Sequence, residues 1–174
     1  MITFGSSGLN TSLSPGAFDL AEWVSLMPAA QIETPALTTA FLLRLPLACL
    51  GLVAAFTIPR RLIAAPLALA VAVALLPPLE FLYDAGNLNY RQQVVLSMLT
   101  FVGGLVAASS IFRRYHHWFA IAISLVGMMA IIIGLTRAYD LMRSFDLVAT
   151  LGLGGVLSGG IFGLVALLLL VRQE

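Results

Sequence analysis

The sequence predicts an all-α membrane protein: a polytopic bundle of five transmembrane helices with a short interfacial amphipathic helix near its N-terminus. Composition is the first observation behind this prediction. Of 174 residues, 60% are hydrophobic and 10% are charged, and the mean hydropathy is +1.02. A soluble domain carries about 25% charged residues. A surface with so few charges must face lipid, which excludes the ordinary soluble classes.

The second observation is the length of the apolar stretches. A helix needs about 20 apolar residues to cross the hydrocarbon core of a bilayer. Five stretches meet this requirement and define a transmembrane domain over residues 35–174: 35–58, 62–83, 94–112, 118–135 and 147–171. The fourth is the shortest, and TRAYDLMRSFD is its natural extension. Because the connections are short, successive spans are expected to be antiparallel neighbours.

The third observation is where arginine collects beside the spans. Five arginines follow the first, third and fifth spans: Arg60, Arg61, Arg113, Arg114 and Arg172. Three lie at the opposite ends: Arg91, Arg137 and Arg143. Basic residues favour the cytoplasmic side of a membrane. The N-terminus is therefore expected outside and the C-terminus inside.

The N-terminal segment, residues 1–34, is predicted to lie on the outer side. Its stretch SPGAFDLAEWVSLMPAA places Ala21 and Val24 on one side of a short helix and Glu22 nearer the opposite side. This pattern predicts an amphipathic helix in the plane of the membrane interface, with Trp23 at the depth of the headgroups. A loosely ordered tail is the alternative.

Small residues at four-residue spacing predict close contacts between helices. Gly155, Gly159 and Gly163 form two consecutive GxxxG patterns in the fifth span. In the third span, Gly103 and Gly104 are each followed four residues later by alanine. Such stripes let helix backbones approach where lipid supplies no hydrophobic drive. The fifth-span stripe either packs inside the bundle or docks another helix, from a second copy or from a different membrane protein.

Arg44 is the first candidate for a polar site inside the membrane. It stands about nine residues into the first span, which is about 13 Å deep at a rise of 1.5 Å per residue. Ionisable residues at such depth face the protein interior and have a partner. The alternative is snorkelling, in which the long side chain reaches up to the headgroups.

A second polar group stands at the outer end of the second span. Glu80, Tyr83 and Asp84 share one helix face because they are three and four residues apart. Pro77 and Pro78 come just before them and remove two backbone donors. The freed carbonyl groups favour a partly wet pocket. Ordinary chemistry of an interfacial loop is the alternative.

Arg44, Glu80 and Arg91 are expected to meet at the outer side, with Tyr83 and Asp84 beside them. The first two spans are antiparallel neighbours, and an arginine side chain about 6 Å long that snorkels outward reaches the level of Glu80. An Arg44–Glu80 pair is therefore predicted. It makes this region the candidate polar site of the protein.

Nothing local points to catalysis. The sequence contains no nucleophile–base arrangement, no Gly-rich phosphate loop and no carboxylate–histidine metal motif. Cys49 is the single cysteine, and His116 and His117 are adjacent, so on a helix they point in different directions and make a poor metal site. The sequence favours a non-catalytic protein that contacts membrane lipids, with no cofactor, no metal and no nucleic-acid partner.

The stretch PLEFLYDAGNLNYRQQVVLSMLTFVGGLVAA resembles the core signature of VanZ-like membrane proteins. That signature is a Glu near the outer end of one helix, an outer loop with an Arg, and a helix ending in a Gly-rich stretch. Glu80, Arg91 and the pair Gly103–Gly104 match it. The upstream FDLAEWVSLMPAAQIE is similar to the segment that precedes the first helices in many members, so the resemblance covers residues 18–108.

The chain departs from the family pattern at two places. Tyr or Asp stands where a Gln often follows the Glu. Ser97 and Thr100 stand where an Asp and an Asn are common in the helix after the Arg. The family's polar pattern is therefore only partly present in this chain.

The resemblance implies a small protein of the bacterial cytoplasmic (inner) membrane, linked to surface polysaccharide or to glycopeptide tolerance. A lipid-linked or glycan ligand at the outward polar site is the expectation that follows. A second interpretation stays open: a small accessory subunit of a larger membrane complex, docked through its Gly-rich helix.

Overall fold

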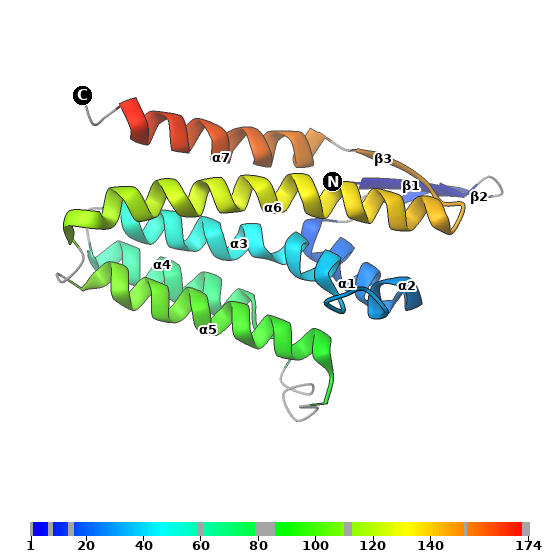
Figure 1. Ribbon diagram of the computed structural model, residues 1–174, viewed down its shortest axis with the longest axis horizontal. Coiled ribbons are helices and arrows are strands. Elements are labelled where there is room, and N and C mark those ends of the chain that lie inside the picture. The colour runs from blue at the N-terminus through cyan, green and yellow to red at the C-terminus, as the bar shows by residue number, and fades with distance from the viewer. Residues whose placement is uncertain are drawn as a thin grey trace.

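Four long helices run side by side along the molecule (Figure 1). The computed structural model describes residues 2–6, 9–13, 16–58, 61–78, 86–109, 113–151 and 153–171. The long helices are α3 (Thr38–Thr57), α5 (Leu88–Ala108), α6 (His116–Ser144) and α7 (Leu153–Val171). Within the described residues, these four are long and apolar enough to cross a membrane. The chain is therefore an integral membrane protein, and its helical fold class is confirmed.

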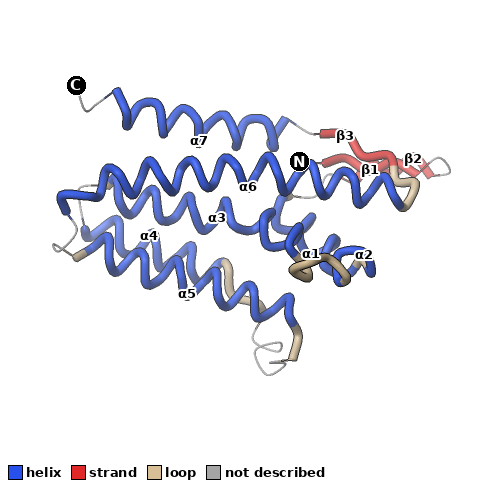
Figure 2. Tube along the Cα trace, in the orientation of Figure 1, coloured by secondary structure: helices blue, strands red, loops and turns tan. Residues whose placement is uncertain are grey.

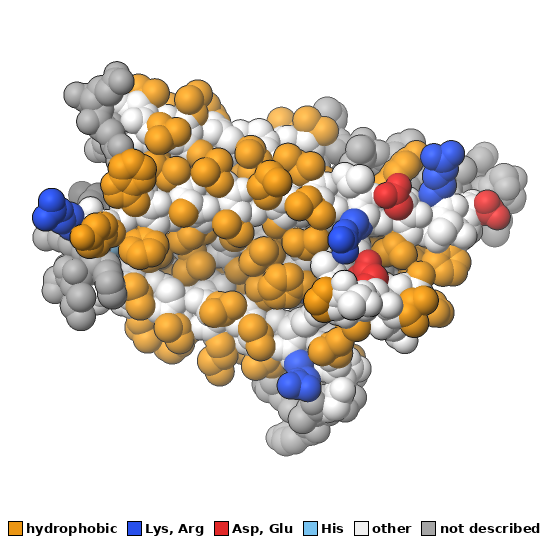
Figure 3. Space-filling model, viewed as in Figure 1, with side chains coloured by type: hydrophobic (Ala, Val, Ile, Leu, Met, Phe, Trp, Pro, Cys, Tyr) orange, Lys and Arg blue, Asp and Glu red, His pale blue; other side chains and the backbone are white. Residues whose placement is uncertain are grey.

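The surface agrees with this assignment. Figure 3 shows hydrophobic side chains over the middle of the visible face, whereas the charged side chains lie at the left end, toward the right end and at the lower edge. Leucine, isoleucine and valine side chains stay exposed along α5, α6 and α7. In water such a surface would aggregate, but in a bilayer it meets hydrocarbon.

Three short helices complete the helical part of the described residues. They are α1 (Ala17–Leu26), α2 (Pro28–Gln31) and α4 (Arg61–Ala74), with a 3₁₀ turn at Arg113–Tyr115 before α6. Helix α4 packs against α3 and α5. Its 14 residues give a length of about 21 Å, which is shorter than a hydrocarbon core of about 30 Å.

A small sheet lies at the end of the molecule where α6 finishes (Figure 2). Its strands are β1 (Ile2–Ser6), β2 (Leu9–Leu13) and β3 (Val148–Leu151). They are antiparallel in the order β2-β1-β3, so β3 pairs with the start of the chain. No strand was predicted from the sequence, and the fifth span was predicted to begin too early, at residue 147. A short apolar run such as VATL cannot be told from the first turn of a helix by periodicity.

The other span boundaries also differ from the prediction. Helix α4 ends at Ala74, not at residue 83, because a residue before proline avoids the helical conformation and Pro77 and Pro78 follow closely. Residues 79–83 lie outside the described part. Helix α5 begins at Leu88, six residues before the predicted 94, where the side chain of Asn87 accepts a 3.0 Å hydrogen bond from the N–H of Asn89.

The extension of the fourth span is confirmed. Helix α6 runs without a break from His116 to Ser144, through most of the sequence TRAYDLMRSFD. Arg137, Asp140 and Arg143 are exposed along its last turns. The helix therefore continues past the apolar residues and carries its charges to one end of the bundle.

Helix α1 is present, but its apolar side packs against protein. Leu20, Ala21 and Val24 are at most 1% exposed, and they form a cluster with Ala138 and Met142 of α6. The apolar side of this helix was predicted to lie in the membrane interface. In the structure that side contacts other helices of the same chain. Burial against α3 and α6 is the contact that the structure provides.

Helices α3 and α6 approach each other closely at small residues. A Cβ atom added at Gly134 of α6 would lie 3.2 Å from the carbonyl carbon of Leu42, and one added at Gly127 would lie 3.1 Å from the Cβ of Cys49. Ala130 and Ala138 lie on the buried side of the same helix. This small-residue stripe was not predicted, although it follows the same packing rule as the others.

The stripe on α7 faces α6. An added Cβ at Gly155 would lie 2.7 Å from Leu135, at Gly159 3.9 Å from Ile131, and at Gly163 3.5 Å from the sulfur of Met128. The three contacted side chains all belong to α6.

Replacing Gly104 with alanine is expected to destabilise the protein by about 1–3 kcal/mol, the usual cost of overpacking. The new methyl group would lie 2.6 Å from the Cβ of Ala68 in α4, a short side chain that cannot turn away. Gly160→Ala is the control, because nothing lies within 4 Å of its Cβ position. Unfolding by SDS in mixed micelles measures both. Equal stability of the two variants would contradict the close α4–α5 contact.

Candidate functional site

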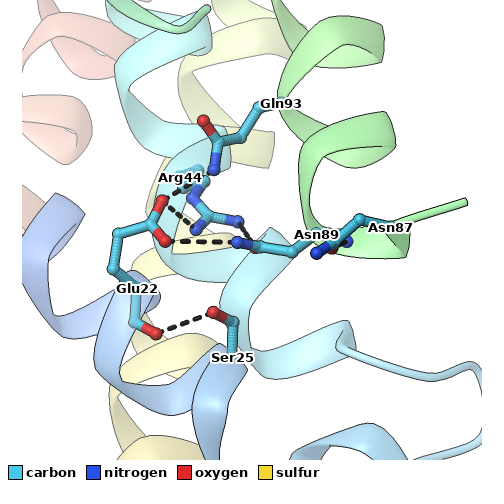
Figure 4. Close-up of polar contacts among 6 residues, drawn as sticks. All are labelled: Glu22, Ser25, Arg44, Asn87, Asn89 and Gln93. Atoms are coloured by element: carbon cyan, nitrogen blue, oxygen red, sulfur yellow. Dashed lines mark hydrogen bonds and ion pairs between the residues drawn. The ribbon is translucent and has the colours of Figure 1, made fainter. Parts of the chain in front are cut away.

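Arg44, a residue of α3, is buried within the bundle, and its side chain is paired with a carboxylate. Its side chain is 0% exposed, and its Nη2 atom donates a 2.6 Å hydrogen bond to Oε1 of Glu22 in α1 (Figure 4). Its Nη1 atom donates a 2.7 Å hydrogen bond to Oδ1 of Asn89 in α5. Within the described part of the chain, Glu22–Arg44 is the one ion pair.

The carboxylate of Glu22 collects hydrogen bonds from three side chains. Besides Arg44, Gln93 donates from Nε2 to Oε1 at 2.6 Å, and Asn89 donates from Nδ2 to Oε2 at 3.1 Å. Hydrogen bonds to an ionised group are shorter and stronger than neutral ones. We call these four residues the Glu22–Arg44 cluster; it joins α1, α3 and α5.

Local structure holds each member of the cluster in place. Asn89 and Gln93 are four residues apart on α5 and therefore share one helix face. Ser25 donates a 2.7 Å hydrogen bond to the backbone carbonyl of Glu22. The ring of Phe18 lies over the Arg44 guanidinium, with its centroid 5.6 Å from the Cζ atom, in cation–π range.

Glu33 fixes the start of α3, the helix that carries Arg44. Its Oε2 atom accepts a 2.9 Å hydrogen bond from the N–H of Thr39, and its Oε1 atom accepts a hydrogen bond from the Thr39 hydroxyl. A carboxylate at a helix N-terminus satisfies free N–H groups and interacts favourably with the helix dipole. The entry of α3 is thereby set relative to α1 and α2.

The predicted site residues have different outcomes. Arg44 is buried with a partner and does not snorkel. Glu80, Tyr83 and Asp84 lie outside the described residues, so the Arg44–Glu80 pair stays a prediction. Arg91 is exposed on α5, and its side chain does not join the cluster.

Sequence reasoning missed three members of the cluster, and a signal existed for two of them. Asn89 and Gln93 are amides on one face of an otherwise apolar helix, and this i, i+4 spacing could have indicated a buried polar face. Glu22 was assigned to the water-facing side of an interfacial helix. In the structure, Glu22 instead accepts hydrogen bonds from side chains of α3 and α5.

A polar cavity opens beside the cluster. It has a volume of about 310 Å³, and Glu22, Ser25, Asn87 and Asn89 contribute polar groups to its wall. Leu88 also lines it. The Glu22 side chain is 37% exposed even though it is paired with Arg44. A ligand in the cavity would therefore meet carboxylate, amide and hydroxyl groups that are already fixed in orientation.

Replacing Gln93 with methionine is expected to cost about 1.5–3 kcal/mol, because the lost hydrogen bond has a charged acceptor. The matched control is Gln92→Met, since Gln92 donates at 3.3 Å to the neutral carbonyl of Ala36 and its loss should cost about 0.5–1.5 kcal/mol. Both are measured by SDS-induced unfolding. A smaller loss for Gln93→Met than for the control would show that the contact with Glu22 contributes little.

The cluster presents hydrogen-bonding groups of fixed orientation beside a cavity. Among the described residues, no group of three or more His, Cys, Asp or Glu side chains could hold a metal ion. The chain matches no protein-family model, and neither the curated proteins nor the solved structures contain a match to it. The function of the protein is therefore inferred from the geometry of the cluster and of its cavity.

Proposed function

We propose that this chain is a non-catalytic, VanZ-like protein of the bacterial cell envelope that binds the polar part of a lipid-linked or glycan ligand. The observation that carries the proposal is the Glu22–Arg44 cluster beside the polar cavity. Intramembrane ionisable residues are expensive and mark functional sites by default. A pair used only for stability would not require a cavity at the carboxylate.

The chemistry of the cavity favours a ligand rich in hydroxyl groups. Glu22 accepts hydrogen bonds, whereas the amides of Asn87 and Asn89 offer both donors and acceptors. A few fixed polar groups of this kind orient a ligand in a pocket. The volume of about 310 Å³ lies at the lower end of ligand pockets, which suits one sugar-sized group.

Five membrane crossings with an outside N-terminus are part of the proposal. Helices α3 and α5 run in the same direction (Figure 1), so the chain between them must return across the bundle. Helix α4 makes most of this return. The excess of arginine at the other end of the bundle supports an outer position for the cluster and its cavity.

Reporter fusions test this topology. Fusions after Arg61 and after Arg114 are expected to report the cytoplasm, because these residues lie on the arginine-rich side. Fusions within residues 85–91 or 138–144 are expected to report the outside. The reversed pattern would place the polar cavity in the cytoplasm and exclude an extracellular ligand.

A polyprenyl-phosphate-linked disaccharide, titrated into the purified protein in nanodiscs, tests the proposed ligand class. Leu88→Trp, which places an indole in the cavity wall and leaves the cluster intact, is expected to weaken binding about tenfold or more. Val95→Trp is the control, because Val95 is 51% exposed on the same helix and lies outside the cavity. Failure of the unaltered protein to bind, or equal weakening by both variants, would overturn the proposal.

The alternative role as an accessory subunit receives less support. The glycine stripe of α7 was predicted to be the docking surface of such a subunit. In the structure this stripe faces Leu135, Ile131 and Met128 of α6. A partner helix would have to displace α6 to use it.

A further inference from the structure

An apolar groove has Arg44 in its lining and shares no lining residue with the polar cavity. Its volume is about 480 Å³, and its lining is contributed by α1, α3, α6 and α7. Apart from Arg44 and Ser158, the lining residues are apolar or glycine. This groove is separate from the site of the proposed function and uses different chemistry.

The packing of the helices explains why the groove exists. Helix α6 packs against both α3 and α7, so Ile131 and Leu135 form its floor, with α3 and α7 on either side. Phe18 and Leu20 of α1 close the end nearest Arg44. At the other end Phe162 of α7 reaches the same cluster as Cys49 of α3. The result is a slot along the bundle.

The length of the slot matches one leaflet of a bilayer. On α7 it runs from Gly154 to Phe162, eight residue steps, or about 12 Å at 1.5 Å per residue. Half of a hydrocarbon core is about 15 Å. On α3 the slot includes Leu47 and reaches Leu50, which is 49% exposed at its rim. Its length therefore suits the part of an acyl chain that lies within one leaflet.

From this geometry we infer that the groove binds a single acyl chain of a membrane lipid. An empty groove would forfeit the dispersion contacts of its whole lining, and water in it would have almost no polar partner. A transmembrane helix does not fit, because a helix about 10–12 Å wide fills about 400–600 Å³ in each 5.4 Å turn. The groove would hold roughly one such turn.

The groove is expected to recognise the acyl chain of the lipid and not its headgroup. Both terminal nitrogens of the Arg44 guanidinium already donate to Glu22 and Asn89, and the Phe18 ring lies over the guanidinium. The Ser158 hydroxyl donates to the carbonyl of Gly155 in its own helix. The remaining nitrogen, Nε of Arg44, has no hydrogen-bond partner within the described residues, but less than 1 Å² of it is exposed, so a headgroup does not reach it. Phosphatidylglycerol and phosphatidylethanolamine should therefore bind alike.

Native mass spectrometry of the full chain tests the inference. The protein is reconstituted in vesicles of palmitoyl-oleoyl phosphatidylglycerol or of the matching phosphatidylethanolamine mixed with phosphatidylcholine, and is then released into detergent. One retained phospholipid per chain is expected from either mixture. Ser158→Phe fills the groove, and it should lower the lipid-bound to lipid-free ratio about tenfold or more.

Leu157→Phe is the matched control. Leu157 is 62% exposed, next to Ser158 on α7, and does not line the groove, so retention should not change. Leu50→Trp, at the exposed rim, repeats the test if Ser158→Phe does not fold. Absence of a retained lipid, equal retention in the filled and control variants, or retention of only one headgroup class would each overturn an acyl-chain site.

Discussion

Replacing Glu22 with glutamine is expected to lower the free energy of unfolding by about 3–5 kcal/mol, because a buried charge is left uncompensated. Arg44 is 0% exposed, so its guanidinium cannot recruit water in place of the lost carboxylate. Glutamine keeps the size of Glu22, and the loss therefore reports charge and hydrogen bonding rather than a cavity. SDS-induced unfolding in mixed micelles gives the value.

Arg44→Met should cost less than Glu22→Gln, about 1–3 kcal/mol, because the carboxylate that stays behind is partly exposed and can be hydrated. The double variant should lose less than the sum of the two, since neither charge then remains without its partner. Strict additivity would show that the two side chains do not interact energetically. A larger loss of unfolding free energy for Arg44→Met would show that packing of the aliphatic part of the arginine side chain contributes more than its charge.

Leu20→Ala is expected to cost about 2–5 kcal/mol, the range for a deleted core side chain. Leu20 is 1% exposed on α1 and belongs to the cluster that joins this helix to α3 and α6. Loosening α1 also removes support from Glu22, two residues further on. Accelerated proteolysis within residues 16–36 should accompany the lower stability.

The control for Leu20 lies in the same helix. Leu26 is 76% exposed, and Leu26→Ala should change stability by no more than about 0.5 kcal/mol. If both alanine variants behave alike, α1 is held by the Glu22–Arg44 pair alone and its apolar contacts contribute little.

The fold was predictable from the sequence as far as the membrane imposes it. Twenty apolar residues in a row can satisfy their backbone groups in lipid only as a helix, and α3 consequently matches its predicted span 35–58 closely. Where that constraint ends, prediction failed. Helix α4 stops before Pro77 and Pro78, and β3 forms where a helix had been expected to begin.

The candidate site was predictable only in part, because pairing depends on which elements meet in space. The depth of Arg44 correctly indicated a buried partner. The identity of that partner could not be read, since Glu22 precedes Arg44 by 22 residues and Asn89 follows it by 45. Separations of this kind leave no periodic pattern, and only the docking of α1 against α3 brings the carboxylate to the guanidinium.

These separations also set an order of assembly. Asn89 is synthesised 45 residues after Arg44, which takes about 2–9 s at 5–20 residues per second. Glu22 has already been made when Arg44 leaves the ribosome, so the two charges can neutralise each other while α5 is still absent. A growing chain that inserts its arginine as a pair avoids exposing a lone cation to lipid, and Asn89 and Gln93 then lock a contact that already exists.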